Sequence, residues 1–293
     1  MSTVHLLISP DAGRGRAAGA HRAVLETIRS AGHTPVDLTC ATADDSAAAA
    51  ADAVADGASR LIVVGGDGLV HLAVQAVAGS TTTLGVVPVG TGNDFARGLT
   101  SIPDDPVEAT HLALRDPKPL DLIHSDAGWV ASIATAGFSG DVNARANRLR
   151  FPKGPSRYTV ATVLELPTLH ARPVRLTVDG EPHEFNAALL AIANTGWFGG
   201  GMHIAPDAAP DDGLLDLTVV ADVGRVELMR FFRLVFSGRH LTHPKVHALR
   251  GRRVVVESLD PDTSELELWG DGDPIGTTPS SFEVAPGALK IAR

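Results

Sequence analysis

The chain has 293 residues, of which 44% are apolar and only 20% are charged, a composition typical of a folded globular protein with two domains. Its formal net charge of −9 excludes general nucleic-acid binding, and its single cysteine, Cys40, excludes an internal disulfide and a multi-cysteine zinc site. No run reaches the roughly 18 uncharged apolar residues of a membrane span, and the first residues lack a signal-peptide pattern. We therefore expect a cytoplasmic protein that contacts membranes only peripherally.

Residues 1–124 alternate strand-like apolar runs with stretches of helical periodicity. Strands are expected at Val4–Ser9, Thr34–Leu38, Leu61–Val64 and Leu84–Val87, and helices at Ala17–Arg29, Asp44–Asp56 and after Gly68. This alternation predicts a parallel sheet covered by helices, so we assign the first domain, residues 1–124, to the α/β class. A short linker is expected near Pro117–Asp126.

Residues 125–293 consist of short strand-like runs separated by Gly, Pro and Asp. The expected strands are Arg175–Val178, Ala187–Ala193, Leu214–Val220, Arg253–Glu257, Leu266–Trp269 and Ser281–Val284. This pattern predicts a second, mainly antiparallel β domain. Its last strand is expected in this domain, with a return to the first domain as the alternative. Helical insertions are expected near Arg157–Leu166 and Arg225–Phe236.

Two glycine-rich turns directly follow the last two strands of the first domain. Parallel strands place such turns at their carboxyl ends, where open α/β sheets bind ligands. Glycine lets backbone amides approach an anion closely, sometimes at positive φ, and the helix after the first turn favours negative charge at its N-terminus. The residues predicted to contact nucleotide phosphates are Gly65, Gly66, Asp67, Gly68, Gly90, Thr91, Gly92 and Asn93.

Asp67 and Asp94 are the catalytic candidates in these turns. A tight turn needs no carboxylate, whereas a carboxylate beside phosphates serves as a magnesium ligand or as a base. The alternative is that both segments are ordinary turns between strand and helix. Two other nucleotide-binding patterns are excluded, because the sequence holds no GxxxxGK[ST] loop and Gly13–Gly15 lacks the third glycine of a dinucleotide fingerprint.

Four longer stretches resemble the bacterial diacylglycerol kinase-like lipid kinases, which are related to sphingosine and ceramide kinases. The stretches are VVGGDG, LGVVPVGTGNDFARGL, NTGWFGGGMHIAPDAAPDDGLLDLTVV and WGDGDPIGTTPSSFEVAPGALKI. The resemblance implies magnesium-dependent transfer of the γ-phosphoryl group of ATP to a lipid hydroxyl in a cleft between the domains. Diacylglycerol is the expected acceptor and phosphatidic acid the product. NAD kinases share the GGDG loop, so an NAD kinase-like enzyme is the alternative among enzymes.

The same resemblance implies further nucleotide contacts near the N-terminus. The family's loop Asn-Pro-x-Ser/Ala-Gly and its following basic residue correspond to Ser9, Pro10, Asp11, Ala12, Gly13 and Arg14. Ser9 replaces an asparagine and cannot make the paired contacts of an amide, so we expect altered nucleotide affinity. The family's nucleotide-contacting threonine corresponds to Thr42, for which a helix cap is the alternative.

The family's Asp-Gly-Glu motif, whose glutamate is taken as the proton acceptor for the lipid hydroxyl, corresponds to Asp271, Gly272 and Asp273. Asp273 is one methylene shorter than glutamate, so the loop must move inward or a water must bridge, with Asp271 as a candidate helper. Asp-Gly is also a strong hairpin signal, and both roles are compatible. Asp273 in place of glutamate, together with Leu69 and Leu72 after GGDG, departs from the family pattern. The alternative is therefore that the protein is a regulator that binds nucleotide or lipid but does not catalyse a reaction.

The loop Pro210–Asp216 resembles the family's structural magnesium loop. Carried over, the resemblance implies that the ligands are the carboxylate of Asp212 and the backbone carbonyls of Ala209 and Leu214. Such an oxygen-only set suits a hard cation. The alternative is a solvated acidic turn.

Basic residues concentrate in one part of the second domain. Residues 224–253 hold eight Lys or Arg residues and one acidic residue, Glu227, around the apolar run Leu228–Phe236. This pattern predicts a surface that docks on a lipid bilayer, where a lipid substrate would be reached. The alternative is a core helix with arginines along its rim. The oligomeric state is left open by the sequence, a homodimer included.

Overall fold

The computed structural model describes residues 2–8, 16–137, 142, 145, 148, 161, 170–224, 227, 231, 233–260 and 265–293, with side chains from residue 19 onward in the first helix. The chain divides into two compact units. Unit 1 comprises Met1–Asp121 and Pro286–Arg293, and unit 2 comprises Leu122–Ala285. The nucleotide loop predicted at Ser9–Arg14 lies outside the described residues, as does all but one residue of the helix predicted at Arg157–Leu166.

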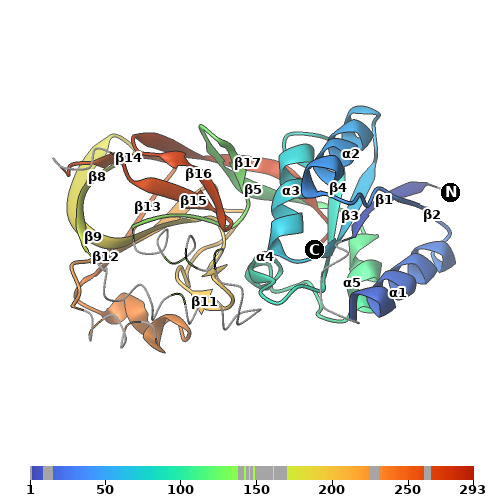
Figure 1. Ribbon diagram of the computed structural model, residues 1–293, viewed down its shortest axis with the longest axis horizontal. Helices are drawn as coiled ribbons and strands as arrows, with labels where there is room; N and C mark the ends of the chain where they lie inside the picture. The colour runs from blue at the N-terminus through green and yellow to red at the C-terminus, as the bar shows by residue number, and fades with distance from the viewer. Residues whose placement is uncertain are drawn as a thin grey trace. The chain divides into compact units, whose positions relative to one another are not determined.

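Unit 1 is built on a parallel sheet with the strand order β17-β4-β3-β1-β2 (Figure 1). The strands are β1 (Thr3–Ile8), β2 (Thr34–Asp37), β3 (Arg60–Gly65), β4 (Thr83–Pro88) and the end of β17 (Ser280–Ile291). The four apolar residues of β3, Leu61, Ile62, Val63 and Val64, are fully buried. Continuous branched apolar strands of this kind need cover on both faces.

Helices provide that cover on the two faces of the unit 1 sheet (Figure 1). They are α1 (Arg16–Ser30), α2 (Ala43–Ala55), α3 (Asp67–Val77), α4 (Asp94–Gly98) and α5 (Pro106–Ala113). Helix α1 packs against α5, and α2 packs against α3. The start of α5 shows the local signal clearly, because Asp105 accepts the N–H groups of Val107 and Glu108, each at 3.0 Å, directly before Pro106.

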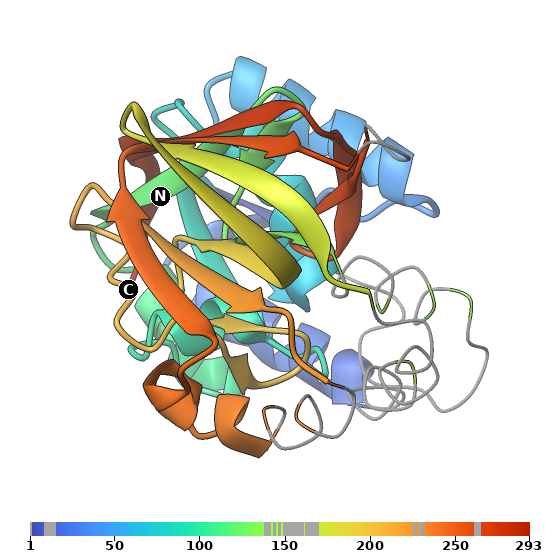
Figure 2. The same ribbon diagram turned by 90° about the vertical axis from the view of Figure 1, so that its left-hand side faces the viewer.

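Unit 2 is mainly antiparallel, and its strands curve around a shared apolar core (Figure 2). Neighbouring strands follow the order β16-β15-β7-β9-β8-β14-β17, with β12 beside β9 and β13 beside β12. The elements are β5 (Lys118–Ser125, which begins in unit 1), β6 (Gly128–Val130), β7 (Ile133–Gly137), β8 (Arg172–Val178), β9 (Glu181–Ala193), β10 (Trp197–Phe198), β11 (Met202–His203), β12 (Leu215–Ala221), the 3-10 helix η2 (Arg239–Thr242), β13 (Val246–Gly251), β14 (Arg253–Ser258), β15 (Glu267–Gly270) and β16 (Asp273–Thr277).

Strand β9 has 13 residues and pairs with three other strands of unit 2, β7, β8 and β12. Its first half pairs with β8 and mixes exposed with half-buried residues, whereas its second half, Ala187–Ala193, is buried throughout. That second half pairs with β12 on one edge and β7 on the other. A strand covered on one face alternates in polarity, whereas a strand covered on both faces is apolar throughout, which is the change seen along β9.

The boundary between the two units, after Asp121, lies within the linker predicted at Pro117–Asp126, but most of this segment is strand β5. Leu120, Leu122 and Ile123 are fully buried there. The buried Asp121 interrupts the apolar residues here and Pro119 precedes them, so the segment lacks the continuous apolar run that marks Leu61–Val64 as a strand. At the other end of the chain, β17 pairs with β14 through Ser280–Glu283 and with β4 through Lys290 and Ile291.

Candidate functional site

The two glycine turns lie against each other at the carboxyl end of the unit 1 sheet. Strands β3 and β4 are parallel neighbours, and the N–H of Val89 donates to the carbonyl of Gly65 at 3.1 Å. A Cβ added to Gly90 would lie 2.5 Å from the Cα of Gly66, and one added to Gly66 would lie 3.2 Å from the Cα of Gly90. The backbones of the two turns are therefore in contact, and a side chain at either glycine would push them apart.

Close approach, and not positive φ, is what requires glycine at Gly66, whose φ is −105°. The left-handed residue in this region is Asn93, the N-cap of α4, with φ 53° and ψ 39°. Asparagine tolerates this conformation better than most residues. Its Nδ2 donates to the carbonyl of Gly90 at 3.2 Å, which closes the second turn on itself.

Asp67 connects the two turns through a hydrogen bond. It is the first residue of α3, and its Oδ1 accepts the N–H of Phe95, the second residue of α4, at 3.0 Å. Asp67 is half-buried and Asp94, which starts α4, is buried. The structure thus brings the two predicted catalytic carboxylates of unit 1 into adjoining turns.

This arrangement offers an anion and a hard cation suitable partners. The N-terminus of α3 carries the positive end of the helix dipole, and exposed Gly68 and Thr91 leave the surface of both turns accessible. The Oδ1 of Asn93 is buried and accepts no hydrogen bond among the described residues. Carboxylate and amide oxygens are the ligands that Mg²⁺ prefers, so Asp67 and Asp94 are candidate ligands, while the described residues contain no group of three His, Cys, Asp or Glu side chains that could hold a metal ion.

Thr42 acts as a helix cap in the structure. Its Oγ1 accepts the N–H of Asp45 at 3.1 Å and donates to the Oδ2 of Asp45 at 2.7 Å, at the N-terminus of α2. This confirms the alternative considered for Thr42. Its contact with nucleotide stays a prediction, as do the contacts assigned to Ser9–Arg14.

Asp271 and Gly272 form the two-residue turn between β15 and β16, with φ values of 52° and 97°. Two positive φ values are what a tight hairpin of this type requires. The carboxylate of Asp271 accepts the N–H groups of Ala131 (2.7 Å), Ser132 (2.8 Å) and Ile133 (3.3 Å). Asp271 therefore anchors the hairpin, while Asp273, the first residue of β16, is exposed.

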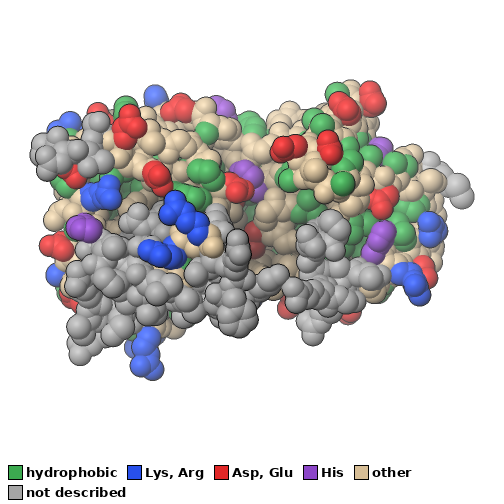
Figure 3. Space-filling model, viewed as in Figure 1, with side chains coloured by type: hydrophobic (Ala, Val, Ile, Leu, Met, Phe, Trp, Pro, Cys, Tyr) green, Lys and Arg blue, Asp and Glu red, His purple; other side chains and the backbone are tan. Residues whose placement is uncertain are grey.

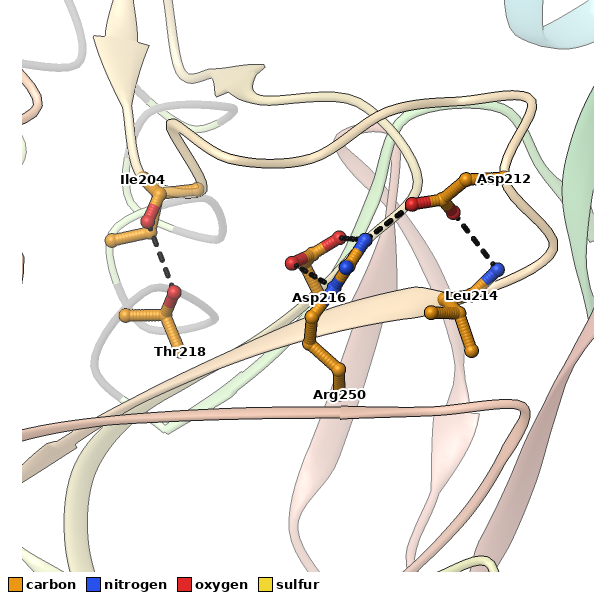
Figure 4. A network of polar contacts seen from close by, with 6 residues as sticks. All are labelled: Ile204, Asp212, Leu214, Asp216, Thr218 and Arg250. Atoms are coloured by element: carbon orange, nitrogen blue, oxygen red, sulfur yellow. Dashed lines mark hydrogen bonds and ion pairs between the residues drawn. The ribbon is translucent and has the colours of Figure 1, made fainter.

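The loop predicted to bind magnesium in unit 2 has the contacts drawn in Figure 4. The Oδ1 of Asp212 accepts the N–H of Leu214 at 3.0 Å, and its Oδ2 pairs with the Nη2 of Arg250. The carbonyl of Ala209 accepts the N–H of Asp212 at 3.3 Å. Two of the three predicted ligand groups thus have protein partners.

Arg250 extends this network to Asp216. Its Nε lies 2.9 Å from Oδ1 of Asp216, and its Nη2 lies 3.3 Å from Oδ2. Burial raises the pKa of the Asp216 carboxyl, and the charge of Arg250 opposes that shift. The hydrogen bond to Asp212 raises the pKa of Arg250, so the guanidinium stays charged.

Not every basic side chain of residues 224–253, the basic segment of unit 2, is available on the surface as an uncompensated charge. Arg225 and Arg230 lie outside the described residues, and Lys245 is engaged with Glu227 at 3.3 Å and with the carbonyl of Asp222 at 2.7 Å. Arg233 and Arg239 are exposed. On the face drawn in Figure 3, acidic side chains are interspersed with the basic ones.

Two residues outside the predicted site stand out in unit 2. Phe236 is 51% exposed, the largest exposed fraction among the described large apolar side chains, and it lies in sequence between the two exposed arginines. Arg250 neutralises two carboxylates, a role that the charge count alone concealed. The sequence held no local signal for this role, because Arg250 lies opposite Asp216 only through the pairing of β12 with β13. In the part of the chain that the structure describes, no helix has the length and apolarity to cross a bilayer.

Comparison with known proteins places both halves of the chain in one family. Residues 3–125 match the diacylglycerol kinase catalytic domain, and residues 132–293 match the YegS C-terminal NAD kinase beta sandwich-like domain. A diacylglycerol kinase of Mycobacterium tuberculosis is 35% identical over 297 aligned residues, which cover 99% of this chain and 94% of the relative. A Xanthomonas euvesicatoria protein named "Probable lipid kinase YegS-like" is 31% identical, over 82% of this chain and 80% of its own length.

Solved structures show the same fold. The crystal structure of a diacylglycerol kinase from Bacillus anthracis aligns with 99% of this chain and 96% of its own, with a TM-score of 0.78 at 22% sequence identity.

The contact between the two turns leads to a first prediction. Gly90→Ala should lower the affinity for ATP at least tenfold, because its Cβ would lie 2.5 Å from the Cα of Gly66 and 2.7 Å from the Oδ1 of Asn93. Gly19→Ala, at an exposed position of α1, is the matched control, since nothing lies within 4 Å of a Cβ there. Calorimetric titration with ATP and Mg²⁺ measures both. Equal affinities in the two variants would show that the turns need not touch to bind nucleotide.

Proposed function

We propose that this chain, which belongs to the diacylglycerol kinase family of lipid kinases, transfers the γ-phosphoryl group of ATP to the hydroxyl of diacylglycerol and forms phosphatidic acid. The observation that carries the proposal is the backbone contact between the two glycine turns of unit 1, joined by the hydrogen bond from Phe95 to Asp67. The choice of acceptor is supported by the Mycobacterium tuberculosis relative named diacylglycerol kinase, which aligns with nearly the whole chain.

In this proposal the two turns hold the phosphates of ATP. Phosphoryl transfer depends mainly on positioning and on neutralising charge, and backbone amides at a helix N-terminus serve both needs. Asp67 and Asp94 would hold Mg²⁺, because their carboxylates come from adjoining turns and suit a hard cation. When bound, that ion neutralises charge on the phosphates of ATP.

Asp273 is the proposed base for the acceptor. Its carboxylate takes the proton of the lipid hydroxyl, whose oxygen bonds to the γ-phosphorus while the bond from that phosphorus to the bridging oxygen breaks and ADP leaves. Asp273 is exposed, and its hairpin is fixed by three backbone hydrogen bonds to Asp271. Asp271 is therefore a positioning residue, and a rigid hairpin restricts where the short side chain of Asp273 can reach.

The lipid is reached at a membrane surface in this proposal. Phe236 is half-exposed between Arg233 and Arg239, which are themselves exposed. An apolar side chain flanked by arginines is the composition of a peripheral docking surface, in which the aromatic ring enters the headgroup region and the charges bind anionic lipids.

Asp67→Asn should abolish lipid phosphorylation and leave the fold intact. The amide oxygen can still accept the N–H of Phe95, whereas the charge that would organise Mg²⁺ is lost. A cost of about 4 kcal/mol, or a thousandfold lower turnover, is expected for such a group. Asp44→Asn, on the exposed first turn of α2, is the control and should be fully active. Transfer of label from γ-³²P-ATP to diacylglycerol measures both, and a third of wild-type turnover in Asp67→Asn would refute the assignment.

Asp273→Asn should lower turnover at least a hundredfold without changing ATP affinity, because the proposed base acts on the acceptor. Asp273→Glu should keep or raise turnover, since the longer acid approaches the hydroxyl more closely. Steady-state kinetics with diacylglycerol, together with calorimetric ATP binding, separate the two effects. Loss of ATP binding in Asp273→Asn would assign this residue to the nucleotide instead.

Docking on anionic lipid has its own test. The double variant Arg233→Gln/Arg239→Gln should bind phosphatidylserine vesicles about tenfold more weakly than wild type, since each arginine near an anionic surface contributes up to roughly 1 kcal/mol. Arg22→Gln/Arg29→Gln removes the same charge from two exposed arginines of α1, outside the basic segment, and serves as the control. Sedimentation with phosphatidylserine and with phosphatidylcholine vesicles measures binding. Equal loss in both double variants would mean that net charge, and not this surface, governs docking.

A further inference from the structure

The loop Ala205–Leu214, which joins β11 to β12, is held at its two ends by different means. At its start, the carbonyl of Ile204 accepts the hydroxyl of Thr218 at 3.0 Å and lies 2.8 Å from the Nε2 of His240. All three residues are buried. At its end, Asp212 contacts Leu214 and Arg250 through its carboxylate (Figure 4), and its N–H donates to the carbonyl of Ala209.

Arg250 is placed for this role by the sheet. It lies on β13 directly opposite Asp216 on β12, so the two side chains share one face of the antiparallel pair. The planar guanidinium presents several N–H donors at fixed angles, which lets it bind Asp216 through Nε and Nη2 and Asp212 through Nη2.

Burial makes a positive charge necessary at this point. The Asp216 side chain is only 12% exposed, whereas those of Asp212 and Arg250 are 30% and 43% exposed. A carboxylate as buried as Asp216 is stable when an opposite charge and hydrogen bonds compensate for its lost hydration. A divalent cation bound by Asp212 would supply charge to this loop, and Arg250 already supplies it through direct hydrogen bonds.

We propose that Arg250 is the resident cation of this loop: it neutralises Asp212 and Asp216 and fixes the loop to β12 and β13, so unit 2 needs no divalent cation here. A corollary follows from the same geometry. Removing the guanidinium leaves two carboxylates facing the space that it filled, which converts the loop into a site for a hard divalent cation such as Mg²⁺ or Mn²⁺. The loop therefore holds a latent metal site that the arginine occupies.

Thermal unfolding without nucleotide tests the resident charge. Between EDTA and roughly 5 mM Mg²⁺, the unfolding temperature of wild type should shift by no more than that of Asp212→Asn, which lacks the carboxylate of the loop, so that Mg²⁺ bound at Asp67 and Asp94 does not affect the comparison. Arg250→Met should unfold about 4 °C lower in EDTA and recover part of that loss in Mg²⁺. Arg252→Met, an exposed arginine two residues away, is the control and should follow wild type in both buffers. A wild type that gains more stability from Mg²⁺ than Asp212→Asn does, or an Arg250→Met that matches the control, overturns the proposal.

Counting bound Mn²⁺ by electron paramagnetic resonance gives a second readout on the full chain. Arg250→Met should bind one more Mn²⁺ per chain than wild type, and the added Asp212→Asn substitution should return the count to the wild-type value. Asp212→Asn alone should leave the wild-type count unchanged. A lower count in Asp212→Asn alone would mean that the ion, and not Arg250, belongs to the loop.

A conservative variant keeps the test valid should Arg250→Met fail to fold. Arg250→Lys retains the charge but not the planar set of N–H donors, so its unfolding temperature should lie between those of wild type and Arg250→Met. If Arg250→Met does not fold, the unfolding temperature of Arg250→Lys should lie below that of the Arg252→Lys control. Arg250→Lys as stable as wild type would contradict the role of the guanidinium fork.

Discussion

The contact between Gly66 and Gly90 is the constraint on which the candidate site depends. Two parallel strands, β3 and β4, end side by side, and their turns meet backbone to backbone because neither residue carries a Cβ. The carboxylate of Asp67 then bonds across to the N–H of Phe95, and Asn93 closes the second turn. Asp67 and Asp94 consequently belong to one compact group, which a side chain at either glycine would divide.

Carboxylates that accept backbone N–H groups recur through both units as the means of fixing turns. Asp271 holds the strand junction at Ala131–Ile133, and Asp179 accepts the N–H groups of Arg252 and Arg253. Asp126 accepts the N–H of Ser281, and this hydrogen bond lowers the pKa of its carboxyl. Charge-assisted bonds of this kind are stronger than neutral ones, so each turn is fixed without a large apolar contact. In the network of Arg250 with Asp212 and Asp216, the carboxylates accept hydrogen bonds from a charged side chain instead of from backbone N–H groups.

The amino-acid sequence predicted the two fold classes and the neighbouring glycine turns, because strand runs such as Leu61–Val64 and the helical spacing of apolar residues after Gly68 are local signals. It did not predict β5, in which the buried Asp121 interrupts the apolar residues. It also could not show that Asp212 meets Arg250, since residues 38 positions apart meet only through the β12–β13 pairing. The phosphate contact expected of Gly66 stays a prediction, and its contact with the other turn is tertiary and had no local signal in the sequence.

Amide hydrogen exchange with ATP and Mg²⁺ tests the central claim most directly, because it reports both turns in one experiment. If the two turns form one phosphate site, exchange at Gly66–Leu69 and at Gly90–Phe95 should slow together on adding ATP, with the same dependence on ATP concentration. In Asp67→Asn both segments should lose most of this protection. Protection of one turn without the other, or of neither while ATP is bound, would contradict a shared site.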